Sequence, residues 1–157
     1  MEQAPSTFCP KDPDYAERVR ASFARQSFMA HLGAELAEVG PGRCTVSLLY
    51  REEFTQQHKH FHGGVIGTLA DNAAGYAAFS LMPAESTILT VEYKLNFVAP
   101  GRGERLIARG LVLRPGRTLS VARAEVYALK DGEERLCATA LETLMCLPGK
   151  PDRASAG

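Results

Sequence analysis

The longest apolar stretch of the chain spans residues 61–83 and holds one charged side chain, Asp71. Small apolar residues occupy most of its positions, and Pro83 ends it. An α-helix that is apolar all round is usually buried in a protein core, and proline interrupts a helix because it lacks the backbone N–H. The pattern therefore predicts a buried central helix over residues 64–82.

Segments that alternate apolar and polar residues, or are rich in β-branched residues, predict strands elsewhere in the chain. Glycine and proline turns separate them, and Lys130-Asp131-Gly132 is typical of a hairpin. The predicted strands are residues 34–39, 43–50, 87–98, 105–114, 118–129 and 135–147. Within 118–129 the apolar residues change phase, so we expect a bulge near Ala122. The polar residues 51–62 are predicted to form a loop.

A further helix is predicted over residues 14–29, with Asp12 or Asp14 as its cap. Gly33 is predicted to end this region. One long apolar helix beside a meandering antiparallel sheet indicates an α+β fold in which the sheet curls around the helix. We expect a single domain over residues 13–147. Residues 1–12 are expected to form a loose arm before it, and residues 148–157 a tail after it.

Charge and cysteine content narrow the possible binding partners and the expected cellular compartment. The 157 residues include 18 basic and 18 acidic side chains, a balance that argues against nucleic acid or an anionic membrane surface as a partner. The apolar stretch is dense in glycine and alanine and contains Asp71, so we expect a core helix and no membrane span. Residues 1–11 contain no apolar leader, and the four cysteines form no CxxC pair. A reduced, cytoplasmic compartment is the expectation.

The central helix begins at a glycine turn, His62-Gly63-Gly64. The first N–H groups of a helix have no partner within it and can hold a negatively charged oxygen. Asp71 lies two turns into the helix, and a carboxylate is rarely buried without a partner or a chemical role. This one segment therefore offers an oxyanion site and a candidate base.

Several short motifs carry a family likeness. His62-Gly63-Gly64 is followed by Leu69-Ala70-Asp71, then by a strand from Thr90 that runs into Ala99-Pro100-Gly101, and by the turn Gly116-Arg117. This combination resembles the hotdog fold, and specifically the phenylacetic-acid-degradation (PaaI-type) thioesterases of the 4-hydroxybenzoyl-CoA thioesterase superfamily. The resemblance covers roughly residues 28–147.

The resemblance implies hydrolysis of acyl-CoA thioesters without a metal or other cofactor, at the interface of a homodimer that often pairs into a homotetramer. Asp71 matches the family's general base or nucleophile. Gly63 matches the residue whose backbone N–H polarises the thioester carbonyl. Thr90 stands where relatives place a hydroxyl that orients water from the partner subunit. The family's loop asparagine is replaced by Gln56, which keeps the amide on a longer stem.

Further residues are expected to contact the substrate. His62, Gly64 and Asn72 belong to or follow the glycine turn and the acidic motif. Arg117 and Lys94 are candidates for the phosphates of CoA, because guanidinium and ammonium groups bind phosphate. Three alternating histidines in the loop before the helix suggest a metal. No acidic or cysteine ligand completes their set, so we expect no metal.

Asp71 lies about 10 Å along the helix from Gly64, at a rise of about 1.5 Å per residue. That is too far to share one carbonyl with Gly63 of the same chain, so we expect a site built from Gly63 of one subunit and Asp71 of the other.

Two alternatives to a thioesterase stay open. One is a hydratase or dehydratase acting on acyl-CoA or acyl-ACP, since residues 60–64 loosely resemble the His-Phe-Pro-Gly motif of hydroxyacyl-ACP dehydratases. The other is a non-catalytic acyl-CoA-binding module. The expected acyl group is aryl, phenylacetyl or of medium length.

Overall fold

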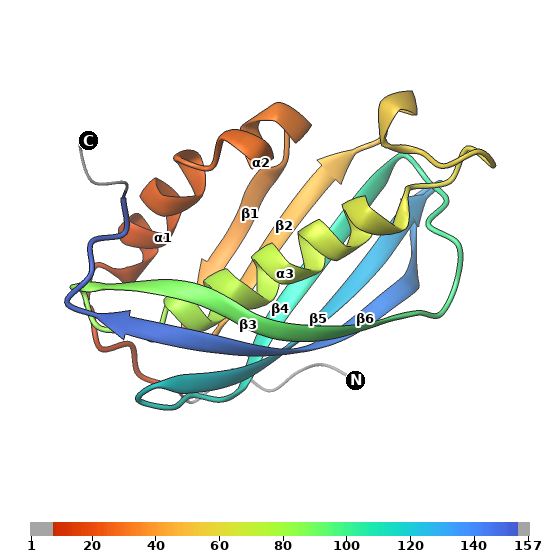
Figure 1. The fold of residues 1–157 in the computed structure, drawn as a ribbon. Helices are drawn as coiled ribbons and strands as arrows, with labels where there is room; N and C mark the ends of the chain where they lie inside the picture. The colour runs from red at the N-terminus through yellow and green to blue at the C-terminus, as the bar shows by residue number, and fades with distance from the viewer. Residues whose placement is uncertain (1–7, 154–157) are drawn as a thin grey trace.

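The computed structural model describes residues 8–153, which form a curled antiparallel sheet around one central helix (Figure 1). The helices are α1 (Tyr15–Ala24), α2 (Ser27–Leu32) and α3 (Gly63–Phe79), with a short 3-10 turn at Glu52–Phe54. The strands are β1 (Glu35–Gly40), β2 (Arg43–Leu49), β3 (Ser86–Phe97), β4 (Arg105–Arg114), β5 (Leu119–Lys130) and β6 (Glu133–Pro148). Their order across the sheet is β1-β2-β4-β5-β6-β3, and every neighbouring pair is antiparallel. The predicted α+β hotdog architecture is confirmed. Parts of the predicted arm and tail, residues 1–7 and 154–157, lie outside the described residues.

Helix α3 crosses the concave face of the sheet and is buried, as its composition predicts (Figure 1). Leu69, Ala70, Ala73 and Ala77 have no exposed surface. The approach is closest at Gly110 of β4, where a Cβ atom would lie 2.1 Å from the carbonyl oxygen of Ala73. Helix and sheet therefore meet backbone to backbone, which fixes the height of α3 above the strands.

The single helix predicted over residues 14–29 is wrong, because the structure has two. The backbone of Gln26 is extended (φ −76°, ψ 101°) and separates α1 from α2. The break turns Gln26 toward α3, where its amide nitrogen donates to the Tyr76 hydroxyl at 2.6 Å. Gly33 ends α2 in the left-handed conformation (φ 73°), as predicted. A tertiary contact therefore overrides the helical periodicity at Gln26.

Strand β5 alternates without a change of phase, contrary to our expectation. Residues 120–128 alternate between buried and partly exposed, which leaves Leu119 and Val121 on the outer face of the sheet. The register shift beside Ala122 is real, but its extra residue is Leu113 of the neighbouring strand β4. The other predicted strands, and α3, lie within three residues of their expected bounds.

Arg18 joins α1 to the C-terminal end of α3. Its Nε donates to the Asp12 carboxylate at 2.7 Å, and a terminal nitrogen donates to the carbonyl oxygens of Phe79 and Met82 at 3.2 and 2.8 Å. The guanidinium carbon also lies 4.1 Å from the centre of the Phe79 ring. A cation is favourable here because the helix dipole is negative at the C-terminus. Asp12, expected as a cap, accepts the N–H of Asp14 at 2.9 Å as well as holding this arginine.

Arg18→Ala is expected to lower the free energy of unfolding by about 3 kcal/mol, because it leaves the nearly buried Asp12 carboxylate without its cation. Urea unfolding at fixed pH and protein concentration measures the change. Arg20→Ala, at an exposed position of the same helix, is the control and is expected to stay within about 0.5 kcal/mol of the wild type. Equal effects of the two substitutions would contradict the role of Arg18.

Within residues 8–153, no helix is both long and apolar enough to cross a membrane. The four cysteines are free thiols that form no disulfide: Cys9, Cys44, Cys137 and Cys146. Burial raises the pKa of the Cys44 thiol to about 12 and that of Cys137 to about 11. These two thiols are therefore protonated and unreactive at neutral pH.

Candidate active site

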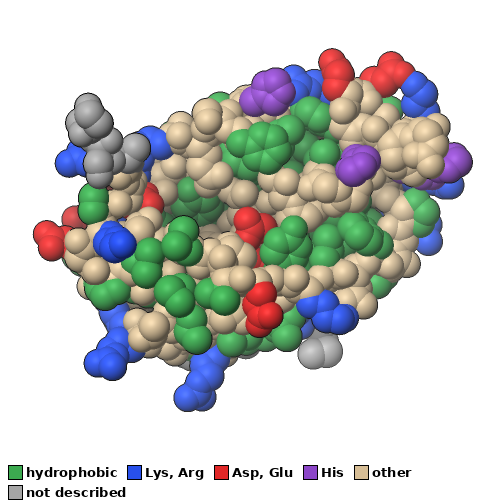
Figure 2. All heavy atoms as spheres, viewed as in Figure 1, with side chains coloured by type: hydrophobic (Ala, Val, Ile, Leu, Met, Phe, Trp, Pro, Cys, Tyr) green, Lys and Arg blue, Asp and Glu red, His purple; other side chains and the backbone are tan. Residues whose placement is uncertain are grey.

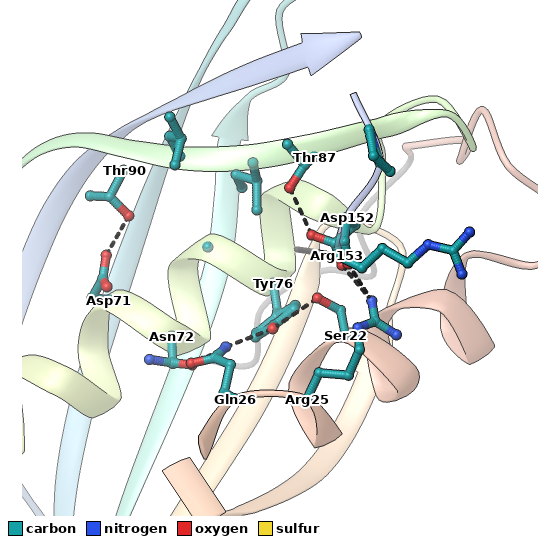
Figure 3. A pocket seen from close by; sticks show the side chains of 14 residues that line it. Ser22, Arg25, Gln26, Asp71, Asn72, Tyr76, Thr87, Thr90, Asp152 and Arg153 are labelled. Atoms are coloured by element: carbon teal, nitrogen blue, oxygen red, sulfur yellow. Dashed lines mark hydrogen bonds and ion pairs between the residues drawn. The ribbon is translucent and has the colours of Figure 1, made fainter. Parts of the chain in front are cut away.

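Asp71 opens onto a cavity of about 810 Å³ between α3, the first half of β3 and the junction of α1 with α2 (Figure 3). Ile88 and Leu89 of β3 and Gly75 of α3 give it an apolar wall. Residues 151–153 line it from the other side. Cavities of this size that combine apolar walls with a few polar groups are typical of small-molecule sites.

The hydroxyl of Thr90 donates to Oδ1 of Asp71 at 2.6 Å (Figure 3). Thr90 faces α3 because the register of β3 against β6 shifts directly after it, with Val91 as the extra residue. Such bulges re-aim side chains and are frequent beside active sites. Thr90 therefore reaches Asp71 within one chain, whereas the resemblance placed this hydroxyl on the partner subunit.

A chain of hydrogen bonds connects the cavity to the junction of α1 and α2 (Figure 3). The side-chain nitrogen of Gln26 donates to Asn72 Oδ1 at 3.0 Å and to the Tyr76 hydroxyl at 2.6 Å. That hydroxyl also lies 3.1 Å from the Ser22 hydroxyl. The amide nitrogen of Asn72 donates to the Thr68 carbonyl at 3.2 Å. Asn72 lines the cavity, and these two bonds use one of its two amide N–H groups and one of the two lone pairs of its oxygen, so a second donor and a second acceptor site remain for a substrate.

The segment that follows β6 is held over the cavity by Asp152 (Figure 3). Its carboxylate accepts the Thr87 hydroxyl at 2.7 Å and a terminal nitrogen of Arg25 at 2.8 Å, and its carbonyl oxygen accepts the same nitrogen at 2.7 Å. The sequence contains no signal for these contacts, since the segment has no periodicity. Part of the predicted tail, residues 148–157, thus forms a wall of the cavity together with Arg153.

Gly63 and Gln56 line a different hollow, of about 420 Å³, which also includes Phe97. His62 caps α3, because its Nδ1 accepts the N–H of Gly64 at 2.9 Å. Among residues 8–153, no acceptor is bonded to the N–H of Gly63. Of the two predicted glycines, Gly63 therefore presents a free backbone N–H, whereas the N–H of Gly64 is used by the cap at the start of α3.

Gln56 is also bonded within its own loop. Its Oε1 accepts the N–H of His58, and its backbone N–H donates to the carbonyl of His60 at 2.9 Å. Gln56 lines the same hollow as Gly63. If Gln56 replaces the family's asparagine, the group that meets a substrate carbonyl is therefore its amide nitrogen.

Lys94 and Arg117 lie away from the cavity of Asp71 in the same chain. Lys94 is exposed on β3 and donates to Asn96 Oδ1 at 2.5 Å. Arg117 is exposed on the turn between β4 and β5 and lines a hollow with Lys11 near the C-terminal end of α3. The structure therefore does not bring these two predicted phosphate contacts together with Asp71 in one chain.

A second carboxylate, Glu142 of β6, was missed by the sequence analysis. Its side chain is 1% exposed, and both carboxylate oxygens lack a hydrogen-bond partner within the described part of the chain. Burial, and secondly the charge of Asp71, raise the pKa of Glu142 to about 8. The sequence did carry a signal, because Glu142 has the same phase in β6 as the inward-facing Ala140 and Leu144.

The loop histidines bond to neighbouring protein groups. Arg102 Nε donates to His60 Nε2 at 2.6 Å. Desolvation, and then the charge of Arg102, lower the pKa of His60. Among the residues that the structure describes, no three His, Cys, Asp or Glu side chains are grouped so that they could hold a metal ion.

Comparison with known proteins identifies the family. The sequence profile of the Thioesterase superfamily matches residues 58–135. A thioesterase family protein from Silicibacter pomeroyi, known from its crystal structure, is 52% identical, with a TM-score of 0.85 over 86% of this chain and 99% of its own. The medium/long-chain acyl-CoA thioesterase YigI of Escherichia coli K12 is 33% identical in an alignment 97 residues long, which covers 54% of this chain and 61% of its own. The E. coli PaaI protein of the phenylacetic acid degradation operon shares the fold, with a TM-score of 0.78 at 20% identity over 87% of this chain and 96% of its own. The chain belongs to the thioesterase superfamily.

Proposed function

We propose that this thioesterase hydrolyses acyl-CoA to the free acid and CoA, with Asp71 as general base or nucleophile. The observation that carries the proposal is a carboxylate at the wall of a cavity of about 810 Å³, bonded at 2.6 Å to the hydroxyl of Thr90. A bond from Thr90 to one oxygen orients the carboxylate and leaves the other free for water or for the carbonyl carbon. The likeness to YigI supports CoA as the thiol of the substrate.

Thioester hydrolysis makes modest demands on the protein. The leaving thiolate is stable, with a conjugate-acid pKa of about 8.5 by analogy with cysteine, so strong acid assistance is unnecessary. What remains is to activate water and to stabilise the tetrahedral oxyanion. Asp71 supplies the first function and the free N–H of Gly63 the second, with the Gln56 amide as a further donor to the carbonyl.

We propose that each active site is shared between two copies of the chain. Asp71 and Gly63 line separate hollows of one chain, and the helix rise of about 1.5 Å per residue keeps them on different turns. A symmetric homodimer can bring Gly63 of one copy to Asp71 of the other, twice per dimer. The pairing of two such dimers into a homotetramer stays a prediction.

The free edge of β3 supports this dimer. β3 is the last strand of the sheet, and an edge strand offers unpaired N–H and C=O groups to another strand. Large apolar side chains are exposed along it, and Figure 2 shows them gathered on this face. The most exposed are Leu89, Val91, Tyr93, Phe97 and Val98. An apolar patch of this kind marks a protein interface, and pairing there would enclose the cavity of Asp71.

For the substrate we propose an acyl group of medium length or an aryl group such as phenylacetyl, because the cavity has the volume and the apolar wall for either. For the phosphates of CoA we propose contacts with Arg117, which lines a hollow together with Lys11, and with Lys94 of β3. The hydratase alternative needs a His–acid pair. The ring of His62 is instead bonded to Gly64, and His60 is bonded to Arg102.

The test is release of free CoA from phenylacetyl-, hydroxybenzoyl-, short-, medium- and long-chain acyl-CoA, followed with a thiol-reactive dye. Turnover of at least one acyl class by the wild type, lost in Asp71→Asn, is the expected result. Equal and negligible release from both proteins, with CoA binding intact, would favour the acyl-CoA-binding module instead.

Mixing two inactive variants tests the shared site. Gly63→Val places a Cβ 2.9 Å from the Phe97 ring and displaces the N–H donor. When Gly63→Val and Asp71→Asn subunits are unfolded together and refolded at equal amounts, half of the dimers are mixed, and each mixed dimer has one intact site. We expect recovery of about one quarter of the wild-type activity. Activity no greater than that of the separately refolded variants would contradict a shared site.

A further inference from the structure

The face of α3 that carries Asp71 lies against β3 and β6. Gly67 and Gly75, one turn before and one turn after Asp71, share this face. A Cβ at Gly67 would lie 3.4 Å from the Tyr93 hydroxyl, and one at Gly75 would lie 3.9 Å from the Leu144 side chain. The two glycines therefore bring the helix close to the sheet on both sides of Asp71.

Glu142 occupies the part of the sheet between these two contacts. It pairs with Tyr93 of β3 across the ladder, and it precedes Leu144 by two residues in the inward-facing row of β6. Glu142 thus lies under the turn of α3 that carries Asp71. The carboxyl group is 1% exposed and does not line the cavity. Any effect on the reaction must therefore pass through Asp71.

No cation compensates Glu142 within residues 8–153. α3 presents Asp71 to it and β3 presents Tyr93. β5 presents Ala122, its partner in the ladder, while Arg123 has the opposite phase and pairs with a carboxylate of its own strand. A buried carboxyl without a cation or hydrogen bond is costly in its charged form.

We infer that Glu142 is a positioning residue that acts through Asp71: as a neutral acid it leaves Asp71 the single negative charge of the pair, and its ionisation makes Asp71 a stronger base. This inference rests on the proposed function. It assigns Glu142 the neutral, protonated form at neutral pH.

Burial decides which carboxyl group keeps the proton. Two neighbouring carboxyl groups in a poorly solvated site lose their protons at different pH values, and the more buried one keeps its proton to the higher pH. Burial first, and the charge of Asp71 second, raise the pKa of Glu142 to about 8. Above that pH a second negative charge appears beside Asp71 and strengthens its hold on the proton that it takes from water. Proton transfer to a stronger base is faster, so kcat rises through this ionisation.

The first measurement is a carboxyl ¹³C NMR titration of Glu142 in the wild type and in Asp71→Asn. We expect the Glu142 resonance to titrate near pH 8 in the wild type and at lower pH in Asp71→Asn, because the negative charge is gone. The second measurement is kcat for CoA release between pH 6 and 9, corrected for spontaneous hydrolysis. We expect a rise of about three- to ten-fold through the Glu142 ionisation in the wild type.

Three variants test whether the rise of kcat with pH comes from the ionisation of Glu142. Glu142→Gln, an isostere of the neutral acid, is expected to lack it. Tyr93→Phe removes the other titratable group that faces Glu142 and is expected to keep it. Glu134→Gln is the matched control, because Glu134 is a partly exposed carboxylate of the same strand, bonded to Arg109 at 2.7 Å, and the rise is expected to persist there too.

Two NMR results would overturn the inference: ionisation of Glu142 below pH 6, or a titration of Glu142 that Asp71→Asn does not change. Two kinetic results would overturn it as well: a wild-type pH profile of kcat without the rise, or a rise that persists in Glu142→Gln. Failure of the wild type to hydrolyse any thioester would overturn the proposed function separately. The NMR titrations would then still decide whether the two carboxyl groups are coupled.

Discussion

Asp71→Asn is expected to lower kcat for thioester hydrolysis by about 10³-fold, the scale of a lost general base. The amide cannot take a proton from water or attack the carbonyl, yet it matches the carboxylate in shape. Its oxygen can still accept the hydrogen bond that Thr90 donates to Asp71. Folding and dimerisation should therefore be preserved. CoA release at saturating substrate measures the loss, with thermal unfolding and gel filtration as controls for structure.

Thr90→Val is expected to cost much less, about ten-fold, since a hydrogen bond to a charged group contributes about 1.5 kcal/mol. Thr90 acts on the reaction by orienting Asp71, so its loss should matter little once the carboxylate is gone. The double variant should then be no slower than Asp71→Asn alone. If the two losses multiply instead, Thr90 does not act through Asp71. A kcat of Asp71→Asn within ten-fold of the wild type would place the base elsewhere.

The fold could be predicted because its signals are local. The apolar run around Asp71 can be satisfied only by burial, and the turns at glycine and proline divide the strands within three residues of their observed bounds. Prediction failed where a distant contact decides the local structure. Gln26 leaves the helical conformation and bonds to Tyr76 and Asn72, which are 50 and 46 residues away in the sequence.

The same distinction applies to the candidate site: features of one continuous segment could be predicted, and contacts between distant segments could not. His62, Gly63 and Asp71 are recognisable because the capped glycine turn and the helix that follows form one continuous segment. The contact between Thr90 and Asp71 depends on the bulge at Val91, which the strand pattern does not indicate. Glu142 could have been found from its phase in β6, but its proximity to Asp71 is set by how α3 packs on the sheet.

The stability of the protein is expected to fall as the pH rises from about 5 to 8, because of Glu142. The folded-state pKa of Glu142 is raised to about 8, from an ordinary value of 4.5. The unfolded chain therefore binds fewer protons than the folded chain between these values, and the free energy of unfolding decreases with pH over that window. Below it Glu142 is neutral in both states. Above it the loss is complete, on the order of 5 kcal/mol.

Glu142→Gln should remove this loss and become more stable than the wild type as the pH approaches 8. Urea unfolding at a series of pH values and one protein concentration measures the difference, which must grow with pH and level off above 8. Glu134→Gln should differ from the wild type by a constant amount over the same range, because Arg109 lowers the pKa of Glu134 and keeps it charged. A pH-independent difference for Glu142→Gln would mean that Glu142 is ionised in the folded protein.

If the expected pH dependence is found, Glu142 is a buried acid that destabilises the fold near neutral pH. Its presence is then best explained by its effect on Asp71. Asp71→Asn, by lowering the pKa of Glu142, should recover part of the same stability while losing the activity.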